Sequence, residues 1–170
     1  RIVIEDVEAT GPLTKAVVDQ AFIHDLSLAN LPRRSLFTVY QGWITRVLAL
    51  RGHSVTLFDK EKDRLALLNG DVATSQAVEG LERFEWIIEA TGSQQVLSVL
   101  LKQAATGATL LLLGLPYTDQ TFNFESIVAF DRSVIGSVGS NGTDFEKALE
   151  ILPQIDTMPF LSASYALAEH

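Results

Sequence analysis

Cysteine is absent from this sequence of 170 residues. Its absence excludes a disulfide scaffold, a thiolate-bound zinc or iron–sulfur cluster, and a cysteine nucleophile within the chain. Basic residues are also scarce, with 13 Lys and Arg against 21 Asp and Glu and a net charge of −8. We therefore expect neither nucleic acid nor an anionic membrane as a partner, because both require a basic face.

Long apolar runs are missing as well. The longest covers residues 109–115, whereas a membrane-spanning helix needs about 20 apolar residues. The 11 glycines and five prolines are ordinary for a globular domain of this length. No apolar signal-peptide segment opens the sequence, so we expect a soluble protein of the cytoplasm, where a lack of cysteine is unremarkable.

Short apolar runs alternate with amphipathic segments along the chain. Strands are expected from Ser35 to Tyr40, over 54–58, 84–89 and 109–114, and from Ser133 to Val138; helices are expected over 12–23, 43–50, 60–68, 94–105 and 144–152. Near-continuous apolar strands are typical of a parallel sheet covered on both sides. The pattern predicts an α/β fold: a doubly wound, mostly parallel sheet with helices on both faces. We divide the chain into a lead-in strand and helix (1–34), this domain (35–156) and a tail (157–170).

Ligands of such sheets bind beyond the carboxyl ends of the strands. Asp59 follows the second expected strand, where a carboxylate can accept hydrogen bonds from both ribose hydroxyls. The alternative, an aspartate that only opens the next helix, is equally compatible with Asp59 alone. Small-residue turns end two further strands, Thr91-Gly92 and Gly114-Leu115-Pro116, and glycine allows close backbone approach to a ligand. Together these three strand ends favour a nucleotide site.

Four segments carry a resemblance to a known family. They are residues 52–59 (GHSVTLFD), 84–92 (FEWIIEATG), 111–116 (LLLGLP) and 131–141 (DRSVIGSVGSN). In order and spacing they resemble the Rossmann-type nucleotide-binding domain of the medium-chain dehydrogenases, the zinc-type alcohol dehydrogenase family. The glucose, sorbitol and threonine dehydrogenase branch is the most similar, over about residues 51–152.

The resemblance implies a nicotinamide dinucleotide, NAD or NADP, as cofactor. Asp59 would hold the adenosine ribose and favour NAD, because a carboxylate repels a 2′-phosphate. Thr91 and Gly92 would line the cleft, and the nicotinamide end would lie near Gly114, Leu115, Pro116 and Val138. The resemblance also implies a homodimer through the edge strand from Ser133 to Val138.

The chain departs from the family in two places. The glycine-rich phosphate loop is reduced to Tyr40-Gln41-Gly42-Trp43, in which Gly42 alone matches a family glycine. No zinc ligands or catalytic residues can be assigned, since there is no cysteine and the three histidines are isolated. We therefore expect the NAD(P)-binding part, or a truncated homologue, of an alcohol or polyol dehydrogenase. The alternatives are a Rossmann module used for dimerisation or protein interaction and, ranked lowest, a methyltransferase-like domain.

Overall fold

The structure, a computed structural model, describes residues 2–5, 33–68, 70, 72–116, 118–139 and 142–156. The strands are β1 (Ile2–Glu5), β2 (Ser54–Phe58), β3 (Ala73–Ser75), β4 (Trp86–Glu89), β5 (Thr109–Leu112) and β6 (Ser133–Gly136). The helices are α2 (Arg33–Leu50), α3 (Lys62–Ala66), α4 (Gln94–Gln103), α5 (Glu125–Val128) and α6 (Gly142–Ile151), with short 3₁₀ turns η1 (Leu81–Arg83) and η2 (Leu152–Gln154). The helix expected over 12–23 and the tail 157–170 lie outside the described residues.

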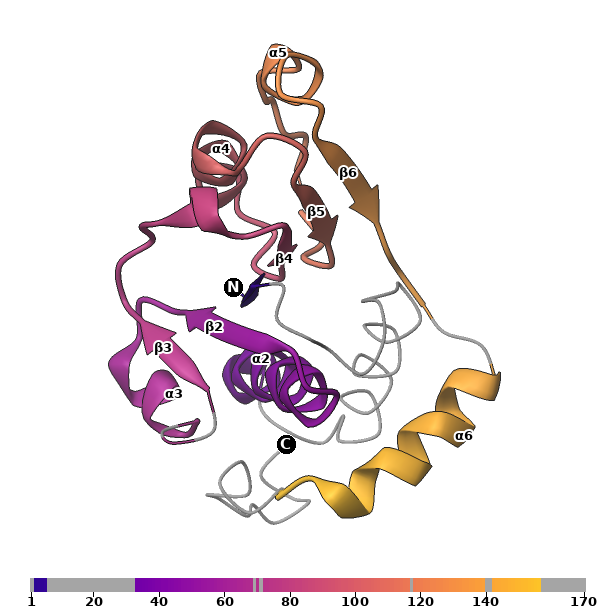
Figure 1. Cartoon of the computed structure of the whole chain (residues 1–170). Coiled ribbons are helices and arrows are strands. Elements are labelled where there is room, and N and C mark those ends of the chain that lie inside the picture. Colours follow the sequence, from indigo (N-terminus) through magenta and orange to yellow (C-terminus); the bar gives the residue numbers. More distant parts are fainter. Residues whose placement is uncertain are drawn as a thin grey trace.

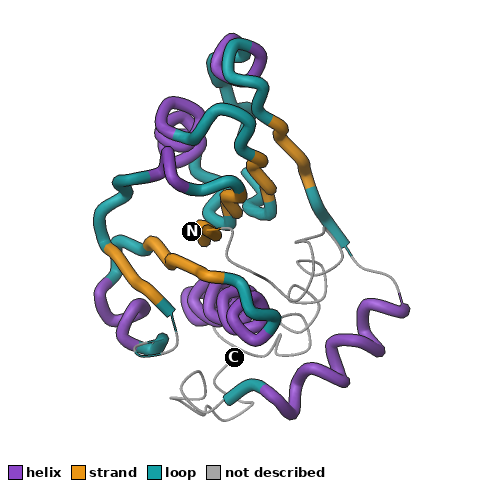
Figure 2. The backbone as a smooth tube through the Cα atoms, viewed as in Figure 1, coloured by secondary structure: helices purple, strands orange, loops and turns teal. Residues whose placement is uncertain are grey.

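One six-stranded sheet organises the molecule, in the order β3-β2-β1-β4-β5-β6 (Figure 1). Strands β2 and β3 pair in parallel, as do β4, β5 and β6. The sheet is therefore mostly parallel, and helices alternate with its strands along the chain (Figure 2). The predicted α/β class is confirmed.

Side chains alternate between the two faces of the sheet and form two apolar clusters. Ile88 and Leu111 belong to one cluster, and their neighbours Ile87 and Leu110 belong to the other. Helix α2 and the end of α6 cover the first face, whereas α4 and η1 cover the second. Burial on both faces explains why β4 and β5 read as continuous apolar runs.

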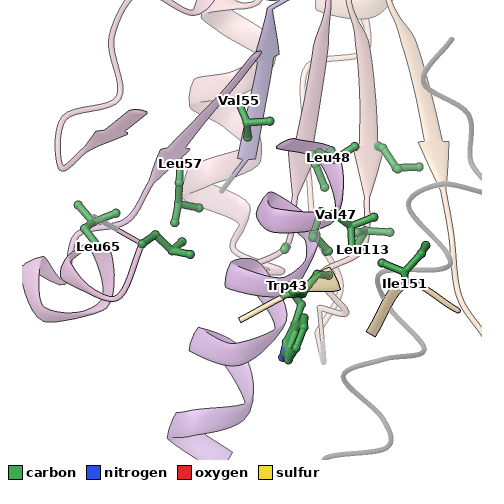
Figure 3. Packing of buried hydrophobic residues seen from close by; sticks show 14 residues of the cluster. Trp43, Val47, Leu48, Val55, Leu57, Leu65, Leu113 and Ile151 are labelled. Carbon is green, nitrogen blue, oxygen red and sulfur yellow. The ribbon is translucent and has the colours of Figure 1, made fainter. Parts of the chain in front are cut away.

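The strand expected from Ser35 to Tyr40 is wrong, because these residues form the first half of helix α2. Short apolar runs do not distinguish a buried strand from a helix. The second half of α2 shows why the helix forms: Trp43, Ile44, Val47 and Leu48 recur at helical spacing and are at most 2% exposed. Figure 3 shows Trp43, Val47 and Leu48 among Leu113, Ile151 and the β2 side chains.

A turn joins α2 directly to β2. Gly52 has a φ of +85°, its N–H donates to the carbonyl of Ala49, and the N–H of His53 donates to that of Leu48. These two bonds form a Schellman motif, which requires a left-handed residue and so favours glycine. Because only three residues separate the end of α2 from the start of β2, the helix packs against the face of the sheet next to this strand.

The lead-in strand expected near residue 1 is present as β1, but it lies at the centre of the sheet. It is antiparallel to both neighbours, pairing Ile2 with Leu57 of β2 and with Ile88 of β4. Because both neighbours oppose β1, β2 and β4 run in the same direction. The end of β1 at Glu5 therefore lies beside the start of β2 at Ser54.

Candidate functional site

The register of the sheet brings four strand ends to one edge. Leu57 and Ile88 are level, since both pair with Ile2. One residue further on, Glu89 pairs with Leu112 of β5, which pairs with Gly136 of β6. The segments after β2, β4, β5 and β6 therefore leave the sheet on the same side. The sequence placed Asp59, Thr91-Gly92 and Gly114-Leu115-Pro116 after strand ends, and the structure agrees. Val138, expected as the last residue of a strand, also lies after one, because β6 ends at Gly136.

Asp59 lies at the end of β2 with its side chain 7% exposed. Its Oδ1 accepts from the backbone N–H of Glu61 at 2.8 Å, and Nη1 of Arg64 lies 3.6 Å from Oδ2. The carboxylate thus stabilises the turn before helix α3, whose N-cap residue is Glu61. A carboxylate has about four acceptor positions, so these contacts leave acceptor capacity for ribose hydroxyls.

A second carboxylate, Glu89, lies beneath the turn that follows β4 and is 3% exposed. It accepts from the backbone N–H groups of Thr91 at 2.7 Å and Gly92 at 3.0 Å, and from the Thr91 hydroxyl. The oxygen of that hydroxyl accepts from the N–H of Ser93 at 3.1 Å. Ser93 in turn caps helix α4 through the N–H of Val96. One chain of hydrogen bonds therefore connects the buried carboxylate to the start of α4.

The turns after β4 and β5 touch at Gly92 and Gly114. A Cβ at Gly114 would lie 2.0 Å from the Gly92 nitrogen and 2.8 Å from Oε2 of Glu89. A Cβ at Gly92 would lie 2.7 Å from the carbonyl oxygen of Leu115, and Gly92 has a φ of +65°. Only glycine fits at either position, so the two glycines serve contact between the strand exits themselves. Leu115 and Pro116 then emerge exposed at the edge.

Two glutamines hold the segment after Pro116 against this turn. Nε2 of Gln120 donates to the carbonyl of Gly92 at 2.9 Å, and Nε2 of Gln94 donates to the carbonyl and hydroxyl oxygens of Thr121 at 3.0 and 2.8 Å. A shallow open depression beside them is lined by Ser93, Gln94, Gln95 and Ser98. The exits of β4 and β5 and the start of α4 therefore form one connected polar corner.

Gly42 does not lie in a strand-to-helix turn, which corrects the setting expected for the phosphate loop. It is buried in the middle of helix α2, next to the fully buried Trp43. Within a helix a backbone N–H is committed to the carbonyl four residues earlier. Gly42 therefore does not present the free backbone amide on which its assignment to a pyrophosphate rested.

The described residues hold neither a metal-ligand cluster nor a membrane-spanning helix. They contain no group of three or more His, Asp or Glu side chains placed to hold a metal ion. No helix among them is both long and apolar enough to cross a bilayer.

Comparison with known families places this edge in context. Residues 43–154 match the sequence profile of a family described as zinc-binding dehydrogenase. The chain belongs to the zinc-binding dehydrogenase family. The match begins within α2 and ends in η2, so it includes all four strand ends. The family expected from the strand-end motifs is confirmed, and no curated protein matches the chain.

Solved structures share the fold at low identity. Galactitol-1-phosphate dehydrogenase from Escherichia coli is 19% identical with a TM-score of 0.65. The match covers 91% of this chain and 54% of the dehydrogenase chain. Acetophenone reductase from Geotrichum candidum, in complex with NAD, is 16% identical with a TM-score of 0.62, covering 82% and 43%. A candidate zinc-binding dehydrogenase from Sinorhizobium meliloti, bound to NADP, is 15% identical with a TM-score of 0.61. The match covers 82% of this chain and 47% of that protein. The chain thus spans about half the length of these proteins.

Sequence reasoning missed Glu89 and the two glutamines as parts of the site. Glu89 carried a signal: it is an acid inside an otherwise apolar strand, WIIEA, where burial demands partners. Gln94 and Gln120 carried none, because 26 residues separate them and only the fold brings them to the same turn.

Proposed function

We propose that this chain binds a nicotinamide dinucleotide across the edge formed by the exits of β2, β4, β5 and β6. The observation that carries the proposal is the placement of Asp59, Gly92 and Gly114 at level strand ends in a zinc-binding dehydrogenase sheet. Two of the similar solved proteins hold NAD and NADP. When bound, the nicotinamide ring supplies hydride transfer, and the protein supplies position.

The described residues fit different parts of such a cofactor unequally. Asp59 has acceptor capacity for the adenosine ribose, and Thr91 with Gly92, held by hydrogen bonds to Glu89, would line the cofactor. Gly114, Leu115, Pro116 and Val138 are assigned to the nicotinamide side. Helix α2 supplies no glycine turn for the pyrophosphate, so Gly42 is left out of the proposed site.

NAD is the cofactor we favour over NADP. The carboxylate of Asp59 would repel a 2′-phosphate on the adenosine ribose, and it is held in place by the N–H of Glu61. Arg64 lies against the same carboxylate, and the next residue along the chain, Lys60, is 86% exposed and forms an ion pair with Glu61. These cations would bind a 2′-phosphate if the negative charge of Asp59 were removed. Removing that charge should therefore reduce the difference between the affinities for NAD and NADP.

The activity proposed for the whole protein is hydride transfer between the dinucleotide and an alcohol or polyol, in the cytoplasm. The proposal of a polyol rests on the resemblance of residues 51–152 to the glucose, sorbitol and threonine dehydrogenase branch and on likeness to galactitol-1-phosphate dehydrogenase. Zinc and substrate groups would come from outside this chain, which lacks cysteine. The domain would therefore contribute cofactor binding and no catalytic residue.

We also propose that two copies pair through β6. In the described sheet β6 lies at the edge with β5 as its one neighbour. Ile135, within β6, is 38% exposed. An exposed apolar edge strand is a template for pairing with another strand, so a second copy of β6 would cover Ile135.

Titration with NADH, monitored by fluorescence, tests cofactor binding. Asp59→Asn keeps an acceptor for the N–H of Glu61 and loses the charge, so NADH binding should weaken by about 1–3 kcal/mol, or roughly 5- to 150-fold. Asp63→Asn, at an exposed position of α3, is the matched control and should bind as the unmodified chain does. An unmodified chain that binds no NADH at millimolar concentration would refute the proposal.

A further inference from the structure

We propose that Glu89 is a positioning residue for the nicotinamide half of the cofactor, an inference that rests on the proposed dinucleotide site. Its carboxylate is buried at 3% exposure and accepts three hydrogen bonds from the turn after β4. In the described part of the chain it forms no ion pair with Lys or Arg. A buried charge without a cation is costly unless donors surround it, so these donors and this carboxylate depend on each other.

The residue type matters because all of its partners are donors. A carboxylate accepts on both oxygens, whereas a glutamine amide replaces one oxygen with an NH₂ donor. That NH₂ would face the N–H of Thr91 or of Gly92 and leave it without an acceptor. Glu89→Gln, nearly identical in shape, would therefore release one side of the turn while preserving its packing.

The position of Glu89 links the turn to the neighbouring strand exit. The backbone carbonyl of Glu89 accepts from Leu113 N–H at 2.8 Å and Gly114 N–H at 3.1 Å. Its carboxylate lies against Gly114, where a Cβ would come within 2.8 Å of Oε2. One residue thus sets the spacing between the turn after β4 and the turn that leads to Leu115 and Pro116. The second turn is the one assigned to the nicotinamide end, and the first, which lines the cleft, is packed against it.

The adenosine half should be independent of Glu89. Asp59 follows β2, and β1 lies between β2 and β4. Two strand spacings separate the exits, about 10 Å. The contacts described for Asp59 come from Glu61 and Arg64 on its own side of the sheet. A change at Glu89 should therefore act on dinucleotide binding and spare a ligand that ends at the adenosine.

The experiment compares two ligands on three proteins. NADH and AMP are titrated by NMR into the full chain, Glu89→Gln and Glu85→Gln; Glu85 is exposed just before β4 and is the matched control. We expect Glu89→Gln to raise the Kd for NADH about tenfold and that for AMP by less than about twofold, since hydrogen bonds to a charged group are the stronger ones. Glu85→Gln should change neither.

The outcomes separate the two proposals. Equal weakening of NADH and AMP, or no weakening of NADH, would overturn the role of Glu89 and leave the proposed function standing. An unmodified chain that binds neither ligand would overturn both. If Glu89→Gln does not fold, hydrogen exchange in the unmodified chain decides: NADH should slow exchange at the Thr91 and Gly92 amides and AMP should not. An equal effect of the two ligands, or none, would overturn the inference.

Discussion

Gly114→Ala should destabilise the fold through a backbone clash at the exits of β4 and β5. The added Cβ would stand 2.0 Å from the Gly92 nitrogen and 2.7 Å from its Cα. Ordinary van der Waals contact begins at 3.4 Å. The exits must therefore separate by about 1.4 Å, which is 3.4 Å minus the 2.0 Å between the added Cβ and the Gly92 nitrogen. Neither neighbour is a flexible side-chain end that could move aside.

The magnitude combines two costs. Overpacking of this kind typically costs about 1–3 kcal/mol. The separation would also lengthen the bond from the Gly114 N–H to the Glu89 carbonyl, 3.1 Å in the native fold, beyond hydrogen-bonding distance, at about 1 kcal/mol. We expect the free energy of unfolding to fall by about 2–4 kcal/mol.

Urea unfolding followed by the fluorescence of Trp43 and Trp86 measures this change. Gly136→Ala is the control: it is the same substitution at the end of β6, where a Cβ meets nothing within 4 Å. It should leave stability within about 0.5 kcal/mol, or raise it slightly by restricting the unfolded chain. Equal stability of the two variants would show that the close backbone contact between Gly92 and Gly114 does not restrict the side chain at position 114.

Two other predictions concern Arg132 and β6. The buried guanidinium of Arg132 donates to the carbonyls of Leu101, Ala104, Ala105 and Ser126 at the end of α4 and in α5. Arg132→Met should lower the free energy of unfolding in urea by about 2–4 kcal/mol, because these carbonyls lose their donor. The control Lys102→Met, at an exposed position, should lower it by less than about 1 kcal/mol. Similar losses in the two variants would argue against a stabilising role for the Arg132 hydrogen bonds. Sedimentation measures self-association, which Ile135→Lys should weaken at least about tenfold. The control Leu149→Lys, at an exposed position of α6, should leave it unchanged. An unmodified chain that is strictly monomeric would refute pairing through β6.

Local pattern was enough for the short apolar strands and for the amphipathic helix α4. The runs that became β2, β4, β5 and β6 are apolar, short and bounded by turn residues, and α4 follows a capping serine, Ser93. Because Asp59, Gly92 and Gly114 directly follow such strands, their arrival at one edge could also be predicted. What local pattern could not decide was the run from Ser35 to Tyr40, which suits a strand as well as it suits the helix that it forms.

Composition and hydrophobic pattern by themselves determined that the chain is acidic, cysteine-free and of the α/β class, and the resemblance of four segments to the medium-chain dehydrogenases indicated the family that the profile match confirms. Only the tertiary structure decided which strand occupies the centre of the sheet, because strand order depends on contacts between distant residues such as Ile2 and Ile88. It alone shows that three donors from Thr91 and Gly92 surround the carboxylate of Glu89. A buried carboxylate is stable only where several donors converge on it, and whether donors converge is a property of the folded turn that sequence spacing does not reveal.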